Sequence, residues 1–268
     1  MTARFGGIAK LYGAEALARL GRAHVLVVGL GGVGSWAVEA LARSGVGALT
    51  LVDGDDVCVS NINRQLHAVE GAIGRPKAEV MAERVRAIQP ACRVTVRTEF
   101  FVRQQADDFF PEPYDFVVDA VDGVTAKATL IGHAHQRGIP VVTCGAAGGK
   151  VDPAQVQVLD LTEVHHDRLL MFTRKLLRKH HGFAPLGRKK SGVAAVFSPE
   201  PVRLAECGAE PEGDAAEELF GEAGARLACD GRLGAATFVT GVFGFLAAAR
   251  VVNQLAGGVS SGSARNRA

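Results

Sequence analysis

Runs of four or five mostly apolar residues alternate with segments of helical periodicity over residues 24 to 143. Each run is shorter than a buried helix and rich in β-compatible residues, so we interpret it as a strand. The patterns predict strands at His24–Val28, Ala48–Val52, Arg93–Val96, Tyr114–Val118 and Ile139–Thr143, and helices at Ser35–Ser44, Ala78–Ile88 and Ala126–Gln136. This alternation predicts an α/β, Rossmann-like fold, a mostly parallel sheet with helices on both faces.

The pattern is less regular after Asp160. A helix at Arg168–His181 and a strand at Val193–Phe197 are predicted, whereas Glu206–Ala225 is acidic and rich in Gly and Ala without a clear period. We expect one domain over residues 1–255, with an irregular substrate or insertion region at about 161–232. Residues 256–268 have the Gly/Ser bias of a flexible tail.

The segment Gly234–Val252 is an apolar C-terminal extension in which only Arg250 is charged. Its length fits a membrane span. Its Gly, Ala and Thr content also suits a helix packed tightly inside a protein or a dimer, and no second span accompanies it. We therefore favour a packed helix over membrane association.

The composition indicates a globular protein and argues against several other classes of protein. The 268 residues are 48% hydrophobic and 22% charged, which indicates a folded globular chain. The formal net charge of +2 is too small to identify a nucleic-acid binder, so any basic surface must be local. The five cysteines form no CxxC pair, which argues against a zinc site and a disulfide scaffold. The N-terminus does not resemble a signal peptide, and we expect a cytoplasmic protein.

The first predicted strand runs into the glycine motif Gly29-Leu-Gly31-Gly32-Val-Gly34, just before a predicted helix. Such glycines let backbone N–H groups approach phosphates at the positive end of a helix. Asp53 ends the next strand, where it can accept hydrogen bonds from ribose hydroxyls. These features predict a nucleotide site and, taken alone, would favour NAD.

A polar set after the second and fourth strands favours a triphosphate instead. Arg64 and Lys77 can neutralise phosphate charge, and the amides of Asn61 and Gln65 can fix oxygens. Asp122 follows a strand end and can hold Mg²⁺ against phosphate oxygens. Asp119, just before it, is expected to orient the loop. These residues predict an ATP and Mg²⁺ site.

The motifs GLGGVGSW, LVDGDDVCVSNINRQ, GRPKAEV and DAVDG resemble those of ATP-dependent adenylyltransferases related to ubiquitin-activating enzymes, the ThiF/MoeB type. Three further stretches, at Arg4–Gly13, Cys144–Pro153 and Cys229–Thr237, are similar to the tRNA threonylcarbamoyladenosine dehydratases within that family. The resemblance covers roughly residues 4–160 and 226–250, and its motifs agree in order and spacing.

The resemblance implies ATP-dependent dehydration of the threonylcarbamoyladenosine beside the anticodon of certain tRNAs. ATP would adenylate the threonyl carboxylate, and a nucleophile of the same modification would displace AMP and close a ring. Gly29, Gly31, Gly32, Gly34 and Asp53 would hold the nucleotide, together with Asn61, Arg64, Gln65 and Lys77, and Asp122 would bind Mg²⁺. Arg64, Lys77 and Asp122 would also act in catalysis. Arg4 would reach the ATP site of a partner subunit, which implies a homodimer.

Two cysteines need separate interpretations. Cys229 could attack the adenylate as a nucleophile, as cysteines do in relatives that transfer sulfur or ubiquitin-like proteins, but packing is the more common role. Cys144 lies in an apolar strand and is expected in the core. The resemblance leaves two further candidates, a monovalent cation near Gly148-Gly149 and a cysteine desulfurase or sulfur acceptor as a partner.

The densest positive cluster comprises the predicted helix residues Arg174, Lys175, Arg178 and Lys179 and the loop residues Arg188, Lys189 and Lys190. This cluster could bind tRNA phosphates without reading sequence, or be an ordinary solvated face. The adjacent pairs His165-His166 and His180-His181 point in different directions and make poor metal ligands, so we expect surface positions for them.

Three alternative functions remain at this stage. The first is an adenylyltransferase that activates the C-terminus of a sulfur-carrier protein, although the paired CxxC motifs that hold zinc in such relatives are missing. The second is an NAD-dependent redox enzyme, which has no need of Asn61, Arg64 and Lys77. The third is a non-catalytic tRNA-binding module.

Overall fold

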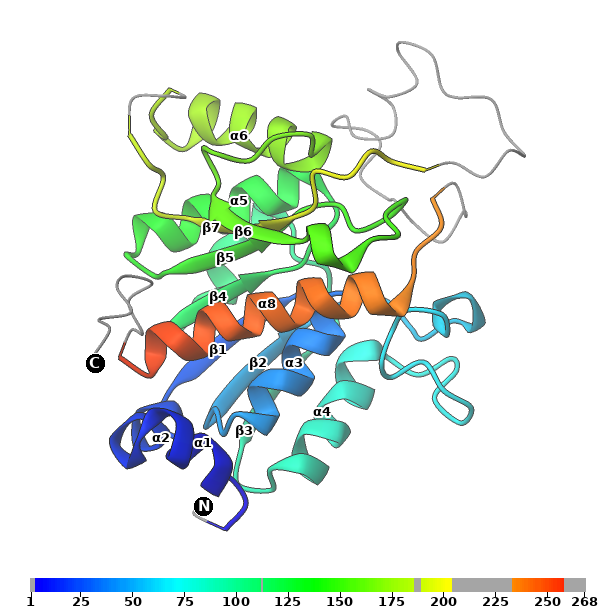
Figure 1. Ribbon diagram of the computed structural model, residues 1–268, viewed down its shortest axis with the longest axis vertical. Helices are drawn as coiled ribbons and strands as arrows, with labels where there is room; N and C mark the ends of the chain where they lie inside the picture. The colour runs from blue at the N-terminus through cyan, green and yellow to red at the C-terminus, as the bar shows by residue number, and fades with distance from the viewer. Residues whose placement is uncertain (1–2, 112, 186–188, 204–232, 258–268) are drawn as a thin grey trace, which may run out of the picture.

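The computed structural model describes residues 3–111, 113–185, 189–203 and 233–257. Its centre is a seven-stranded sheet in the order β3-β2-β1-β4-β5-β7-β6 (Figure 1). The strands are β1 (His24–Val28), β2 (Ala48–Val52), β3 (Arg93–Arg97), β4 (Phe116–Asp119), β5 (Val141–Cys144), β6 (Gln157–Asp160) and β7 (Ala194–Phe197). All neighbouring pairs are parallel except β6 and β7, so the predicted fold class is confirmed.

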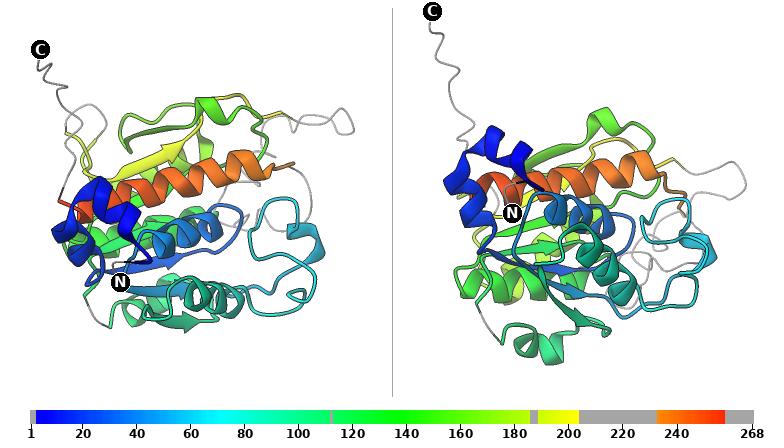
Figure 2. Two further views of the ribbon diagram at one scale, coloured as in Figure 1. Left: turned by 60° about the horizontal axis from the view of Figure 1, so that its bottom comes forward. Right: turned by 90° about the horizontal axis from the view of Figure 1, so that it is seen from below.

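Helices cover both faces of the sheet (Figures 1 and 2). One hydrophobic cluster joins α3 (Gly34–Arg43), α4 (Lys77–Ile88) and α8 (Thr237–Leu255) to one face, through Val25 and Val27 of β1. The opposite face packs through Leu26 and Val28 on α5 (Val124–Gln136), α6 (Arg168–His180) and the 3-10 segment η2 (Arg103–Phe109). Successive side chains of β1 thus pack against helices on opposite faces of the sheet, as the alternation of side chains along a strand requires.

Several short elements were not predicted. The helices α1 (Gly6–Tyr12) and α2 (Ala14–Leu20) precede the sheet and turn at Gly13, whose φ is +91°. Strand β6 was missed because it is a short edge strand with a half-exposed, polar pattern rather than an apolar run. Two further 3-10 segments, η1 (Val59–Asn61) and η3 (Pro153–Gln155), lie in connections.

The order of strands creates a crevice at one edge of the sheet. β1 pairs with β2 on one side and with β4 on the other, so the chain leaves β1 and β4 toward opposite faces. In open α/β sheets, ligands bind beyond the carboxyl ends of strands at such a switch point. The loops that follow β1, β2 and β4 all meet at this edge.

The C-terminal helix α8 is long and apolar enough to pass as a membrane span, and about half of its apolar window is buried inside the protein. It lies across α3 and beside β5 and β7 (Figure 1). Gly244 makes the contact with α3 possible, because a Cβ there would lie 2.5 Å from Val33 O and 2.7 Å from Trp36 Cβ. The prediction of a packed helix is confirmed.

This contact predicts opposite effects of the same substitution one helical turn apart. Gly244→Ala should force α8 away from α3 and destabilise the fold by about 1–3 kcal/mol, lowering Tm by about 2–10 °C. Gly241→Ala is the matched control, because its Cβ would lie 3.8 Å from Trp36, an ordinary contact, and it gains helix propensity. Thermal unfolding monitored by circular dichroism tests this; equal Tm values for both variants would contradict the close packing.

Candidate functional site

The glycine loop between β1 and α3 is shaped by two close approaches of the backbone. Gly29 has φ +85°, and a Cβ on it would lie 2.7 Å from Ala120 O in the loop after β4. A Cβ on Gly34 would lie 1.8 Å from Gly29 O. Gly31 and Gly32 face Gln65 and Arg64 instead. The loop therefore folds tightly between two strand ends and leaves the N-terminus of α3 beside polar side chains.

Asp53 ties this loop to the end of β2. One carboxylate oxygen accepts from Leu30 N at 2.6 Å, and the other accepts from Asp55 N at 2.9 Å. Burial raises the pKa of its carboxyl, and the charge of Lys77 opposes this shift. Each oxygen keeps a second lone pair, so the predicted contact with a ribose hydroxyl is compatible with these bonds.

Asn61, the last residue of η1, and Gln65 after it each have one buried amide atom without a hydrogen-bond partner among the described residues. Asn61 Oδ1 accepts from Cys58 N at 3.1 Å, but within the described part of the chain Asn61 Nδ2 and Gln65 Oε1 are buried without a hydrogen bond. A buried polar group left without a partner costs about 1–3 kcal/mol. Groups of this kind beside a phosphate-loop fold indicate a ligand that completes their bonding.

Arg64 lies beside the glycine loop. Its guanidinium donates to Ser60 O at 2.7 Å and to Asn63 Oδ1 at 3.0 Å, and its carbonyl accepts from Trp36 Nε1 at 3.1 Å. These bonds hold the residue against α3. They leave other guanidinium donors for an anion, because Arg carries five N–H groups.

Lys77 begins α4, and its side chain is buried. Its ammonium donates to Asp55 Oδ2 at 2.8 Å, while its backbone N–H donates to Asp55 O at 3.0 Å. The ammonium is near enough to Asp53 and Asp122 to influence both carboxyls. It therefore lies within the polar set at the ends of β2 and β4.

Asp122 is an exposed residue on the loop between β4 and α5. The surrounding protein limits its hydration and raises the pKa of its carboxyl, while Lys127 and Lys77 counter the shift. No group of three His, Cys, Asp or Glu side chains in the described ranges could hold a metal ion by itself. One carboxylate suits Mg²⁺, which binds through one or two carboxylates, substrate phosphates and water.

Asp119 orients this loop, as expected, through a buried network that sequence reasoning did not foresee. Its Oδ1 accepts from Val121 N at 3.1 Å. Its Oδ2 accepts from Lys127 Nζ at 2.9 Å and from Thr143 Oγ1 at 2.6 Å. The side chains of Asp119 and Lys127 are both fully buried. A lysine inside a helical pattern gave no signal of this role.

His67 is a second residue that the sequence did not single out. It is buried, and neither ring nitrogen has a hydrogen-bond partner among the described residues. Burial lowers the pKa of its imidazole to about 4, with a smaller contribution from Lys77. The ring is therefore neutral at physiological pH, and it lies close to the Lys77 ammonium.

Arg4 does not reach this site within its own chain. Its guanidinium donates to Ile88 O at 2.6 Å, at the end of α4 opposite Lys77. At about 1.5 Å per residue, the two ends of α4 are about 17 Å apart. Cys229 and Arg188 lie outside the described residues, as does Glu206–Ala225.

The basic residues of α6 divide into two groups. Lys175, Arg178 and Lys179 are exposed, as is Lys189 in the following loop, and Lys190 pairs with Glu163 at 3.2 Å. Arg174 instead turns inward and donates to Leu161 O and Val164 O, at 3.1 and 2.6 Å. Burial lowers the pKa of its guanidinium. Arg174 is held by the fold and lies apart from the exposed basic surface.

The structure also describes Cys144, Gly149 and the two histidine pairs, which the sequence singled out. Cys144 is buried in β5, where burial raises its thiol pKa to about 12, as a core residue should behave. Gly149 has φ +71° and connects the segments that contain Arg203 and Gly234. Its backbone N–H donates to Gly234 O at 2.7 Å, and its carbonyl accepts from Arg203 N at 2.8 Å. The surface prediction holds for His165, His166 and His180, whereas His181 is half-buried because its ring packs on Gly132.

Comparisons with known proteins agree with this architecture. The ThiF family model matches residues 7–265. The tRNA threonylcarbamoyladenosine dehydratase of Haemophilus influenzae is 46% identical over 252 residues, which cover 94% of this chain and 93% of that protein. The enzyme of the same name from Escherichia coli is 45% identical over 255 residues, covering 94% and 93%.

A solved structure supports the same assignment. The Escherichia coli tRNA threonylcarbamoyladenosine dehydratase, crystallised in complex with ATP, superposes with a TM-score of 0.82 at 43% identity, covering 95% of this chain and 94% of that one. The family model and both relatives span nearly the whole chain, so the relationship extends beyond the glycine loop. The chain belongs to the ThiF family.

Proposed function

We propose that this protein is an ATP-dependent enzyme that dehydrates threonylcarbamoyladenosine beside the anticodon of tRNA and closes it into a ring. One observation carries the proposal: the glycine loop, Asp53, the two unpartnered amides, Lys77 and Asp122 all meet at one sheet edge. This set occurs in a chain that matches dehydratases of that name over 94% of its length.

The chemistry proceeds in two balanced steps. The threonyl carboxylate attacks the α-phosphorus of ATP, so that an acyl adenylate forms and pyrophosphate leaves. A nucleophile of the same modification then attacks the acyl carbon, and AMP leaves with one former carboxylate oxygen. The substrate loses the elements of one water molecule, and no nucleophile from the protein is required. Cys229 therefore has no necessary part in this route.

The protein's contribution is positioning and charge stabilisation. The N-terminus of α3 and the glycines receive the phosphates, Asn61 and Gln65 complete their bonding on the nucleotide, and Asp53 receives the ribose. Arg64 and Lys77 stabilise the charge that develops at the α-phosphorus and on pyrophosphate. Mg²⁺, held by Asp122 and phosphate oxygens, would supply further charge neutralisation.

Asp55 keeps Lys77 ready for this role. The ion pair at 2.8 Å fixes the buried ammonium at the start of α4 before the nucleotide arrives. Because the Asp55 side chain is half exposed, solvent weakens the pair, and a phosphate can take over part of the lysine's bonding.

The tRNA-binding surface is proposed from the positions of exposed basic residues alone. The exposed residues Lys175, Arg178 and Lys179, with the loop lysines, form the proposed tRNA surface. We also propose one functional domain over residues 1–255 and a cytoplasmic location, where tRNA and ATP occur. The monovalent cation near Gly149 and the sulfur-acceptor partner stay predictions.

We further propose a homodimer that shares Arg4 between subunits. Arg4 lies at the far end of α4 from its own site, as a residue that serves a partner would. The outer side of α8 exposes Phe238 and Phe245, which are 57% and 47% exposed, two turns apart on one stripe. An exposed aromatic stripe of this kind suits burial against a second copy.

The metal assignment predicts a loss of turnover in Asp122→Asn. Removing the carboxylate should lower the rate of AMP formation by about 100-fold or more, because the phosphate charge would lack a fixed Mg²⁺. AMP release and the mass of the nucleosides after digestion of threonylcarbamoyladenosine-bearing tRNA measure it. Glu15→Gln, which removes a charge from α2, is the control. Turnover within a few-fold of the unsubstituted protein would contradict the assignment.

The shared site predicts complementation between two inactive variants. Arg4→Ala and Lys77→Ala should each be inactive alone, but after mixing and subunit exchange half of the dimers pair one of each and hold one intact site. About one quarter of the original activity should return, by the statistics of pairing in a two-fold dimer. Sedimentation should give twice the chain mass. A monomeric mass, or no recovery despite demonstrated exchange, would refute the shared site.

A further inference from the structure

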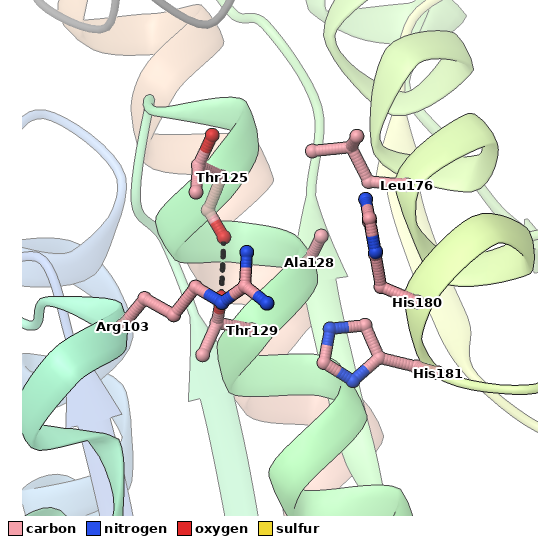
Figure 3. A pocket seen from close by; sticks show the side chains of 7 residues that line it. All are labelled: Arg103, Thr125, Ala128, Thr129, Leu176, His180 and His181. Carbon is pink, nitrogen blue, oxygen red and sulfur yellow. Dashed lines mark hydrogen bonds between the residues drawn. The ribbon is translucent and has the colours of Figure 1, made fainter.

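A pocket beside helix α5 is not used by the proposed chemistry. It lies where η2, α5 and α6 meet, and Figure 3 shows its lining. The residues around it are Arg103, Thr125, Ala128, Thr129, Leu176, His180 and His181. Arg103 reaches in from η2, and the two imidazoles extend from the end of α6 toward α5 (Figure 3).

The lining carries cationic groups without an acidic counterpart. None of its residues is acidic, and among the described residues the Arg103 guanidinium has no hydrogen-bond or ion-pair partner. The nearby carboxylate of Asp107 is occupied by Arg137 at 2.6 Å and His133 at 3.2 Å. Arg178 and Lys179, one turn or less before the histidines, add exposed positive charge. The pocket is therefore suited to an anion.

Helix α5, on which His181 packs, fixes the position of the His181 ring. A Cβ on Gly132 of α5 would lie 2.1 Å from His181 Nδ1, so only glycine allows the ring to rest there. Glycine inside a helix costs roughly 1 kcal/mol relative to alanine. His133 contacts the same ring, with 6.4 Å between centroids. The imidazole is thus held in place at the pocket wall, unlike a freely rotating surface histidine.

The pocket lies beside the first turns of α5, close in sequence to the loop that carries Asp122. Thr125 is three positions after Asp122, in the first turn of α5, and Arg103 begins the segment after β3. Thr129 Oγ1 donates to Thr125 O at 2.8 Å, so its hydroxyl proton is already used and the donors available to an anion come from Arg103 and the histidines (Figure 3). An extended polyanion whose reacting nucleotide lies at Asp122 would place a neighbouring backbone group here.

We propose that Arg103, His180 and His181 form a subsite for a backbone phosphate of the tRNA substrate, next to the modified nucleotide. This inference rests on the proposed function, since it takes the polyanion to be RNA. Arg103 supplies positive charge, and the two histidines supply ring N–H donors. Phosphate contacts of this type position a nucleic acid without reading its sequence.

His181 makes the affinity of the subsite for phosphate depend on pH. Burial lowers the pKa of His181, and the charges of His133, His180 and Arg103 lower it further, so the empty pocket favours the neutral ring. A phosphate favours the protonated ring and raises that pKa again. Binding therefore takes up a proton, and tRNA affinity should rise as pH falls from about 8 to about 6. The other charged neighbours are Asp107 and Arg137, which pair with each other at 2.6 Å, and the hydrogen bond from Arg137 lowers the pKa of the Asp107 carboxyl.

The test measures the affinity of threonylcarbamoyladenosine-bearing tRNA by fluorescence anisotropy at several pH values and salt concentrations. Arg103→Ala should raise Kd about tenfold and reduce the slope of log K against log salt by about 0.7–0.9, the loss of one phosphate contact. His181→Asn should flatten the pH dependence. Kd for ATP should not change in either variant. Arg22→Ala, an exposed arginine after α2, is the matched control.

The outcomes separate this inference from the proposed function. If the unsubstituted protein forms AMP and a nucleoside lighter by one water, but Arg103→Ala binds tRNA with the original Kd and salt slope, the subsite is wrong and the function stands. If that protein converts no tRNA, the function fails first. An equal loss of ATP affinity in Arg103→Ala would assign the residue to the nucleotide site and overturn the inference. Retained affinity in Arg103→Lys, with unchanged Tm, would support it.

Discussion

The buried ion pair between Asp119 and Lys127 is the contact on which the arrangement of the site depends. Both side chains are fully buried, and the carboxylate also accepts from Thr143 Oγ1 and Val121 N. Removing one partner from such a pair leaves a desolvated charge, which costs about 3–5 kcal/mol. The pair joins the end of β4 to β5 and to the first turns of α5, so the short loop that carries Asp122 has little freedom.

That loop in turn sets the position of the glycine loop. The backbone of Ala120 lies so close to Gly29 that a side chain at Gly29 would overlap it. Because the two loops leave neighbouring parallel strands, they are in register, and fixing one fixes the other. Asp122, the proposed Mg²⁺ ligand, and the glycine loop, the proposed phosphate-binding backbone, are therefore placed by the same packing, which suits the proposed reaction because it depends on the alignment of a carboxylate with an α-phosphorus.

The sequence predicted the sheet and the polar set because each buried parallel strand is an apolar run, and the residues after such runs must gather at one edge. It could not predict roles set by distant partners. Lys127 looks like any helical lysine until Asp119 and Thr143 surround it. Arg174 turns inward because its guanidinium donates to carbonyls of the segment between β6 and α6, and His181 packs on Gly132 because helices α5 and α6 meet. No local pattern encodes either contact.

Two buried amides link the stability of the protein to its proposed function. Within the described part of the chain, Asn61 Nδ2 and Gln65 Oε1 are buried without a hydrogen bond, an arrangement that costs about 1–3 kcal/mol for each group. In the proposed complex the nucleotide completes the bonding of these amides, so the cost of desolvation is recovered there. Ligand that binds only the folded state raises its stability by RT ln(1 + [L]/Kd). On the proposed function, the same two side chains lower the stability of the protein without nucleotide and raise its affinity for the nucleotide.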